Sequence, residues 1–272
     1  MSAAQPTLLG LPYDASSSYL RGAAGAPAAI RAALRCDSSN SWSEALIDVL
    51  APGVLGDAGD LSLGVDAVAA RAAIEQGIGA LLARGGRPIL LGGDHSVTYP
   101  VLRALRARHP QLTILHIDAH ADLYDQFEGD RFSHACPFAR IMEEGLCDRL
   151  VQVGIRTLSD HQRAQAERYG VEIIDMRAWA AGTRPVLTGP VYLSLDLDGL
   201  DPAFAPGVSH LEPGGLTTRE VLGLIQGLPA PFVGADVVEL NPARDPSGVT
   251  AMVAAKIVKE IASRMLETIP PP

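Results

Sequence analysis

Short apolar runs alternate with helical segments along the chain. Seven runs have the length of strands, and most are apolar on both faces: 7–12, 88–93, 113–118, 150–155, 171–175, 191–198 and 232–240. Strands that are buried on both faces are typical of parallel sheets. Segments with helical periodicity lie between them, among them 65–84, 99–109, 159–169, 217–227 and 247–267. This alternation predicts an α/β fold of βαβ units, with a parallel sheet covered by helices on both faces.

The composition narrows the class of protein. With 272 residues, 47% of them hydrophobic and 19% charged, the chain has ample length for a sizeable core. No linker, repeat or low-complexity block divides it, so we expect a single domain over residues 1–272. The formal net charge is −9 and no basic cluster is present, which argues against nucleic acid as a partner. An acidic chain weakly favours a cationic small molecule.

The cysteines and the N-terminal sequence suggest where the protein works. Cys36, Cys136 and Cys147 form no CxxC pair, so we expect free thiols in a reducing compartment. The start "MSAAQPTLLG" has neither a basic nor an apolar region of signal-peptide type. The Ala/Leu-rich stretch 66–86 contains Arg71 and Glu75, which is typical of an amphipathic helix and not of a membrane span. We therefore expect a cytoplasmic protein without a membrane partner.

Residues of types that can bind metals follow four of the predicted strands. Because ligands of open parallel sheets bind outside the carboxyl ends of the strands, these residues are expected to converge. They are Asp94 and His95 in "GGDHS", Asp118, His120 and Asp122 in "DAHAD", Asp196 and Asp198 in "SLDLD", and Asp236 and Glu239 in "ADVVEL". Taken singly, each has an ordinary explanation as a helix cap, a surface acid or a buried histidine. Together, so many carboxylates at one edge would repel one another unless a cation neutralised them, so we predict a metal site.

The ligand types indicate which metal. Carboxylates and imidazoles without a thiolate favour Mn²⁺, with Ni²⁺ or Co²⁺ as alternatives. Six of these residues are the candidate ligands: His95, Asp118, His120, Asp122, Asp196 and Asp198. They exceed what one structural zinc site needs, and they suit a pair of ions bridged by carboxylates. Such a pair would lower the pKa of a bound water and supply a hydroxide for hydrolysis of a cationic substrate.

The three blocks "GGDHS", "DAHAD" and "SLDLDGLDPAFAPG" resemble the signature motifs of the ureohydrolase family, the arginases and agmatinases. The resemblance extends over nearly the whole chain and is strongest to plant-type arginases, in "DLYDQFEGDRFSHA", "APGVSHLEPGGL" and "GADVVELNP". It implies a three-layer α/β/α fold with a mainly parallel eight-stranded sheet. It also implies a homo-oligomer, either a trimer or a hexamer.

The resemblance also implies roles for single residues. One Mn²⁺ would be held by His95, Asp118, Asp122 and Asp196, and the other by Asp118, His120, Asp196 and Asp198. His134 matches the family's proton-shuttling histidine, a suitable role for a group whose pKa lies near neutrality. Glu239 matches the carboxylate that orients the guanidinium. Asp122 is expected to accept a proton from the nucleophile and to pass it to the leaving amine.

The sequence does not decide which chemical group the substrate carries at the end away from the guanidinium. Asp125, Glu128 and Asp130 suit the ammonium of agmatine, whereas Arg131 suits the carboxylate of arginine; segment 36–44 is a second candidate. We expect L-arginine, giving urea and ornithine, with agmatine and then guanidinobutyrate as alternatives. No basic cluster favours formiminoglutamate. A catalytically inactive partner protein is disfavoured because all the ligands, His134 and Glu239 are present.

Overall fold

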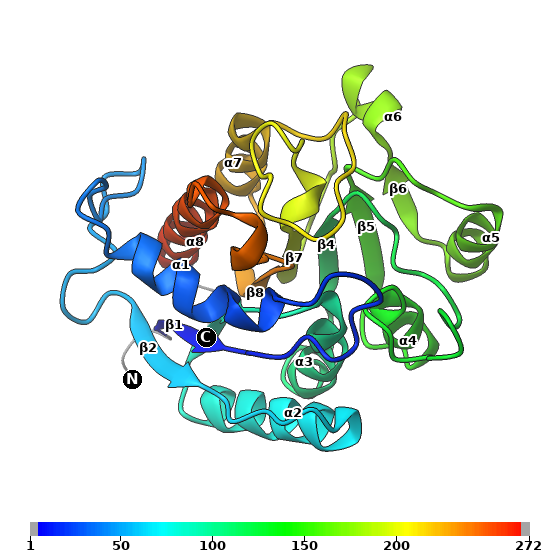
Figure 1. Ribbon diagram of the computed structural model, residues 1–272, viewed down its shortest axis with the longest axis horizontal. Coiled ribbons are helices and arrows are strands. Elements are labelled where there is room, and N and C mark those ends of the chain that lie inside the picture. The colour runs from blue at the N-terminus through cyan, green and yellow to red at the C-terminus, as the bar shows by residue number, and fades with distance from the viewer. Residues whose placement is uncertain (1–4, 268–272) are drawn as a thin grey trace.

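The computed structural model describes residues 5–267 and contains one eight-stranded sheet, all of it parallel (Figure 1). The strand order across the sheet is β2-β1-β3-β8-β7-β4-β5-β6. The strands are β1 (Pro6–Gly10), β2 (Gly56–Asp60), β3 (Arg87–Leu91), β4 (Thr113–Ile117), β5 (Arg149–Val153), β6 (Glu172–Ile174), β7 (Val191–Asp196) and β8 (Phe232–Val238). The predicted parallel sheet is confirmed, and each of the seven apolar runs overlaps one of these strands.

One strand was missed. β2 has the sequence "GDAGD", lies at the edge of the sheet and is largely exposed. It has no apolar run because it has little core to face, and its residues have low strand propensity. It pairs in parallel with β1, and this contact alone shows it to be a strand.

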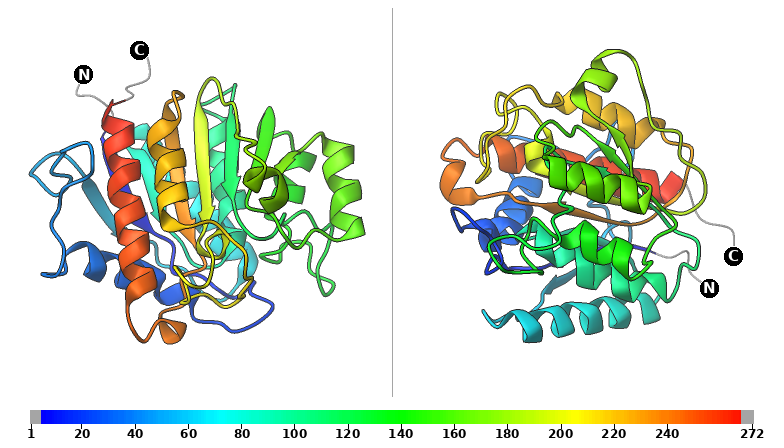
Figure 2. Two further views of the ribbon diagram at one scale, coloured as in Figure 1. Left: turned by 90° about the horizontal axis from the view of Figure 1, so that it is seen from above. Right: turned by 90° about the vertical axis from the view of Figure 1, so that its right-hand side faces the viewer.

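Helices cover both faces of the sheet and form the two outer layers of the predicted three-layer α/β/α fold (Figure 2). The helices are α1 (Ala26–Leu34), α2 (Ala67–Ala83), α3 (Thr98–Arg106), α4 (Pro137–Glu143), α5 (Asp160–Tyr169), α6 (Met176–Ala180), α7 (Thr218–Gly227) and α8 (Val249–Glu267). α1, α7 and α8 pack into one apolar core, and α2, α3 and α4 into the other. Side chains of β4 point alternately into the two cores: Leu115 and Ile117 lie in the first, and Ile114 lies in the second.

Side-chain caps fix where several helices begin. Ser159 and Gln162 form a capping box at the start of α5, and Thr217 and Glu220 form another at the start of α7. Asp66 accepts the Ala69 N–H at the start of α2. Within residues 5–267, no helix is long and apolar enough to cross a membrane.

The centre of the sheet positions the functional residues. β3, β8, β7 and β4 are neighbours, so their carboxyl ends and the loops that follow lie at one edge. The loop after β3 passes very close to the loop after β1: a Cβ on Gly93 would lie 1.6 Å from the carbonyl oxygen of Tyr13. Only glycine permits this approach. The "GG" of the first motif thus packs two loops together at the site.

Candidate metal centre

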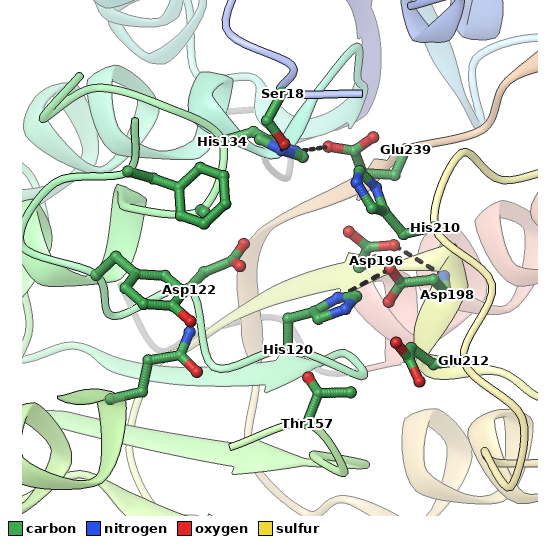
Figure 3. A pocket seen from close by; sticks show the side chains of 14 residues that line it. Ser18, His120, Asp122, His134, Thr157, Asp196, Asp198, His210, Glu212 and Glu239 are labelled. Carbon is green, nitrogen blue, oxygen red and sulfur yellow. Dashed lines mark hydrogen bonds and ion pairs between the residues drawn. The ribbon is translucent and has the colours of Figure 1, made fainter. Parts of the chain in front are cut away.

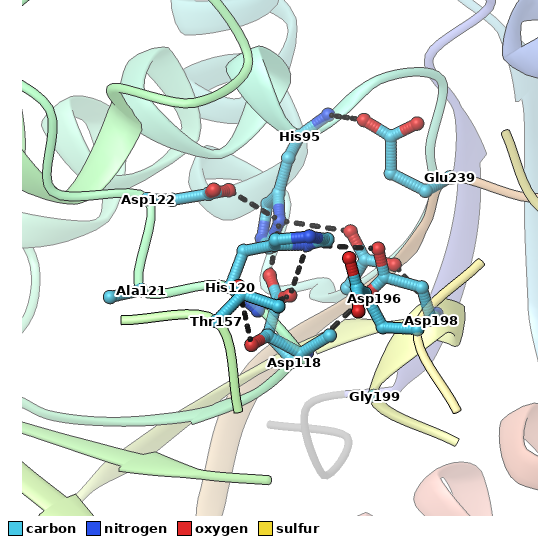
Figure 4. Close-up of polar contacts among 12 residues, drawn as sticks. His95, Asp118, His120, Ala121, Asp122, Thr157, Asp196, Asp198, Gly199 and Glu239 are labelled. Carbon is cyan, nitrogen blue, oxygen red and sulfur yellow. Dashed lines mark hydrogen bonds and ion pairs between the residues drawn. The ribbon is translucent and has the colours of Figure 1, made fainter. Parts of the chain in front are cut away.

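Three strand ends supply the six predicted metal ligands. His95 follows β3 in a short 3-10 helix capped by Asp94, Asp118 follows β4 directly, and Asp196 ends β7. These residues, with Asp122 and Asp198, are buried, while His120 is partly exposed. The structure brings all six predicted ligands together in one cluster (Figure 4).

Three carboxylates converge on one imidazole nitrogen. His95 Nδ1 lies 3.1 Å from Asp118 Oδ2, 3.1 Å from Asp122 Oδ2 and 3.3 Å from Asp196 Oδ2. Yet this buried nitrogen makes no hydrogen bond within the described residues. Buried polar atoms normally have a partner, so Nδ1 and the three oxygens are arranged for something that all four can bind at once.

The hydrogen bond on the other side of the His95 ring, at Nε2, explains why Nδ1 can direct its lone pair toward a cation among the carboxylates. The buried Asp236 carboxylate accepts hydroxyl protons from Thr98 at 2.8 Å, Tyr192 at 2.7 Å and Ser194 at 2.8 Å. Because Ser194 donates its only hydroxyl proton to Asp236, its oxygen accepts a hydrogen bond from His95 Nε2, 2.9 Å away. His95 therefore carries its proton on Nε2 and presents a free Nδ1, as a metal ligand must.

Asp118 also faces a second imidazole. Its Oδ1 lies 3.4 Å from His120 Nδ1, which is in turn 3.1 Å from Asp198 Oδ2. Asp118 thus directs one oxygen toward each histidine, the arrangement of a carboxylate that bridges two cations. Backbone N–H groups hold these acids: that of Asp198 donates to Asp196 Oδ1 at 2.8 Å, and that of Ala119 to Asp198 Oδ1 at 3.1 Å.

His116 supports the bridging carboxylate from behind. Gln152 Nε2 donates to His116 Nδ1 at 3.0 Å and to the carbonyl of Ala121 at 2.7 Å. His116 therefore donates from Nε2 to Asp118 Oδ2, 2.8 Å away. Its lone pair is already used, so we assign this buried histidine the role of orienting Asp118, although its atoms lie close enough to His95 and Asp118 for a metal site.

Two of the functional residues have strained backbones. Asp122 has a φ of 50° and Glu239 a φ of 65°, a left-handed conformation that costs side chains other than glycine on the order of 1–3 kcal/mol each. Each residue directs its side chain into the site (Figure 3). The fold stabilises this geometry in spite of its cost, which is typical of functional sites.

The electrostatics of the cluster favour a cation. Burial, and then the neighbouring charge of Asp198, raise the pKa of Asp196 well above its usual value. Burial and the charge of Asp118 raise the pKa of Asp198 to about 6. Divalent cations would relieve this repulsion, and carboxylate oxygens with imidazole nitrogens are donors that suit such ions. The residues therefore fit a pair of divalent ions.

His134 and Glu239 stand beside the cluster as a second functional unit. His134 Nδ1 lies 3.0 Å from Glu239 Oε1, and His134 Nε2 lies 2.8 Å from the hydroxyl oxygen of Ser18. The same Glu239 oxygen accepts the backbone N–H of His95 at 2.9 Å. Ser18 belongs to the loop after β1, which Asp94 holds by accepting the Ser16 N–H at 3.0 Å.

A cavity of about 270 Å³ opens onto the cluster (Figure 3). Its lining includes four of the predicted metal ligands, His134 and Glu239; the other lining residues are Ser18, Tyr124, Phe127, Ala135, Thr157, Gln162, His210 and Glu212. Sequence reasoning missed this second set as site residues. The signal was present for His210 and Glu212, which lie in "APGVSHLEPGGL", a segment we used only for the resemblance.

Two residues predicted to contact the substrate lie elsewhere. Asp125 and Arg131 do not line the cavity but pair with each other, with 2.7 Å between Oδ1 and Nη1. Asp125 is also bound by Arg140 at 3.1 Å, and Arg131 by Glu143 at 3.0 Å. Segment 36–44 contributes no lining residue either. The predicted substrate contacts of Asp125 and Arg131 thus gain no support from this geometry and stay a prediction.

Known proteins resemble this chain over almost its full length. It is 47% identical to "Arginase 1, mitochondrial" of Arabidopsis thaliana, over 96% of this chain and 81% of the relative. The solved structure of an arginase from Medicago truncatula matches with a TM-score of 0.92 and 45% identity, covering 97% of this chain and 88% of that one. A guanidinobutyrase of Pseudomonas aeruginosa is 33% identical over 96% of this chain and 86% of the relative.

The expected cytoplasmic location is contradicted by these relatives. The Arabidopsis and Medicago arginases are named as mitochondrial, and a second Arabidopsis arginase as chloroplastic or mitochondrial. Our expectation rested on the absence of a recognisable secretion signal and on unpaired cysteines. Neither feature distinguishes the cytosol from the interior of an organelle, since that interior can also keep thiols reduced.

The family itself follows from an independent comparison. The model of the arginase family matches residues 4–263, a range that includes every predicted metal ligand, His134 and Glu239. The match agrees with the eight-stranded parallel sheet and with the cluster at its centre. The chain belongs to the arginase family.

Proposed function

We propose that this protein hydrolyses the guanidino group of L-arginine to urea and ornithine at a pair of divalent metal ions. The observation that carries the proposal is the convergence of three carboxylates on the unpartnered Nδ1 of His95, with Asp118 extending to His120. The arginases among the relatives support arginine as the substrate. We propose Mn²⁺ as the native metal, with Ni²⁺ and Co²⁺ as alternatives that suit the same donors.

The metal ions would be held as the geometry of the two groups suggests. His95, Asp122, Asp118 and Asp196 would bind one ion, and His120, Asp198, Asp118 and Asp196 the other. When bound, such a pair lowers the pKa of a coordinated water and so supplies a nucleophile at neutral pH.

Glu239 would orient the guanidinium. Its Oε1 already accepts from His134 and from the backbone N–H of His95, whereas its Oε2 makes no hydrogen bond within the described residues. Oε2 is therefore available to accept an N–H of the substrate. A carboxylate paired with a guanidinium forms a strong, directional contact, which would place the guanidinium carbon for attack.

Asp122 and His134 would move protons. Asp122 accepts a proton from the attacking water and passes it to the chain nitrogen of the substrate, as the bond between that nitrogen and the guanidinium carbon breaks. Urea and the amine of ornithine are then the products. His134, connected through Ser18 to the exposed residues 18–21 of the loop after β1, exchanges protons with solvent.

The charges around the cavity support a cationic substrate. Among residues 5–267, no lysine or arginine lines it, and two lining carboxylates that are not proposed metal ligands, Glu212 and Glu239, are left for a cationic substrate once the metal ions are bound. Agmatine shares the guanidinium and a second positive charge, so it is the main alternative. Guanidinobutyrate, the substrate that one relative's name implies, has an anionic end that this lining favours less.

A urea assay tests the proposal. Metal-free protein would be loaded with Mn²⁺, Ni²⁺ or Co²⁺ and given L-arginine, agmatine or 4-guanidinobutyrate. We expect metal-dependent release of urea and ornithine, with the highest kcat/KM for arginine and Mn²⁺. Asp196→Asn is the control and is expected to lose tight metal binding together with activity. Full turnover by the metal-free protein, or a clear preference for another guanidine, would refute the corresponding part of the proposal.

A further inference from the structure

We propose that Glu212 binds the ammonium end of the substrate and thereby selects guanidines that carry a second positive charge. This inference rests on the proposed function and names the residue that distinguishes arginine and agmatine from guanidino acids. It assigns the role first predicted for Asp125 to another carboxylate on a different loop.

Among the carboxylates that line the cavity, the one on Glu212 has no side-chain partner within residues 5–267. The other four acidic lining residues each lie against a histidine: Asp122 and Asp196 against His95, Asp198 against His120, and Glu239 against His134. The side chain of Glu212 makes no hydrogen bond or ion pair within residues 5–267, although the residue is half-buried and lines the cavity. A partly desolvated carboxylate without a partner gains most from a cation.

The backbone at Glu212 is firmly held. Arg156 donates to its carbonyl oxygen from Nε at 3.0 Å and from Nη2 at 2.5 Å, and also to the carbonyl of Asp198 at 2.6 Å. The following turn is fixed by Asp201 Oδ2, which accepts the Gly214 N–H at 2.6 Å. Arg156 thus ties the backbone of Glu212 to the segment after β7 that carries Asp198, so the backbone from which the Glu212 carboxylate projects is fixed relative to the metal cluster.

The position of Glu212 fits the far end of a bound guanidine. Figure 3 shows Glu212 and Thr157 on the side of the cavity opposite His134 and Glu239, with His120 between them. A guanidinium held by Glu239 leaves the rest of the substrate to extend away from it. An ammonium at that end would meet Glu212.

The same arrangement disfavours an anionic end. The lining includes no lysine or arginine within the described chain, and Arg131 is occupied by Asp125 and Glu143. A carboxylate without an ammonium would approach Glu212 as a like charge in a partly desolvated cavity, which is unfavourable. In arginine, whose α-carbon carries both groups, the ammonium offsets this repulsion.

Steady-state kinetics on the Mn²⁺-loaded protein test the inference. In Glu212→Gln, kcat/KM for arginine and for agmatine should fall about tenfold or more, the usual range for losing a charged hydrogen bond. The loss should appear in KM with kcat nearly unchanged, and kcat/KM for 4-guanidinobutyrate should stay the same or rise. Glu167→Gln is the matched control: it removes an equal charge from an exposed acid on α5, outside the cavity, and should leave the kinetics with all three substrates unchanged.

Two outcomes would overturn the role of Glu212: kinetics of Glu212→Gln that match those of Glu167→Gln, or an equal loss for all three guanidines. Calorimetry separates this failure from that of the proposed function. L-ornithine and putrescine carry a second ammonium at the end away from the amine that hydrolysis releases, and they should bind the Mn²⁺-loaded wild type more tightly than Glu212→Gln. 4-Aminobutyrate should not distinguish them. This result is expected even if the wild type releases no urea from arginine, and equal binding by both proteins would refute the inference.

Discussion

The imidazole of His134 and the carboxylate of Glu239 form a buried pair, with 3.0 Å between Nδ1 and Oε1. Burial alone would lower the pKa of His134, but the hydrogen bond and the charge of Glu239 outweigh it and raise the pKa to about 9. His134 is therefore charged at neutral pH in the metal-free protein. The residue that we propose as a proton relay also contributes to stability.

The first prediction concerns the pH dependence of that stability. Because the folded-state pKa of His134 lies above its unfolded value of about 6.5, the stabilisation is complete below pH 6.5 and is lost as the pH rises through about 9. Urea unfolding of metal-free protein should show a loss across this window, of which His134 contributes about 1–3 kcal/mol. In His134→Gln the loss should be smaller by that amount; His95 and His120, whose pKa values burial would lower but contacts with buried carboxylates raise, should keep the rest. An unchanged slope would contradict the assignment.

Ser18 provides the second prediction. Its hydroxyl oxygen lies 2.8 Å from His134 Nε2, on an exposed loop that reaches solvent. Ser18→Ala should lower kcat about two- to tenfold by interrupting proton exchange, while KM and metal content stay the same. The kcat of the variant should recover in buffers of small imidazoles. A higher KM with unchanged kcat would instead make Ser18 a substrate-binding residue.

Much of this site could be predicted because its residues follow apolar strands in recognisable motifs. Asp118 and Asp196 stand where buried strands of a parallel sheet end, so the sequence alone places them at one edge. The partners of surface loops cannot be predicted in this way. Asp125 looked available for a substrate, but it is occupied by two arginines. Glu212 lies in a segment that resembles the family, but its place in the cavity follows only from the fold.

The same limit applies to the fold. β2 has no apolar pattern, and it is a strand because β1 offers unpaired backbone groups beside it. The supporting residues of the metal cluster depend on the fold as well. Ser194 is one more residue of an apolar strand in the sequence, and only the contact with Asp236 reveals which proton it can give.

The third prediction tests this contact. In Ser194→Ala, the proton acceptor for His95 Nε2 is lost, so the ring no longer has a fixed tautomer with Nδ1 free. Loss of such a supporting hydrogen bond typically weakens metal affinity by about 10–100-fold. Calorimetric titration of the metal-free variant with Mn²⁺ measures this directly. Ser194→Thr keeps the hydroxyl and is the matched comparison; equal affinities of Ser194→Ala and wild type would contradict the proposed orientation of His95.

Removal of the metal gives the fourth prediction. Without cations, the buried acids Asp118, Asp196 and Asp198 repel one another, as the raised pKa of Asp196 indicates. Mn²⁺ in about hundredfold excess over its Kd should add about 3 kcal/mol of stability and raise Tm by roughly 5–10 °C. Asp196→Asn should gain much less from the same addition. A wild-type Tm that does not respond to Mn²⁺, Ni²⁺ or Co²⁺ would argue against a metal centre.

The last prediction concerns the backbone that connects the two halves of the cluster. A Cβ on Gly199 would lie 2.9 Å from the backbone nitrogen of Asp118, closer than real Cβ contacts allow, and 3.0 Å from its Cα, which is also a tight contact. These are backbone atoms, so Gly199→Ala must displace either the start of the Asp118 loop or the segment that carries Asp198. We expect a loss of about 1–3 kcal/mol in stability, typical of overpacking, and weaker Mn²⁺ binding in calorimetry.

Gly79→Ala is the control, because Gly79 lies inside α2 with nothing within 4 Å of the added Cβ. That variant should gain about 0.5–1 kcal/mol from helix propensity without a change in metal affinity. Wild-type metal binding in Gly199→Ala would mean that the positions of Asp118 and Asp198 are not coupled through this contact.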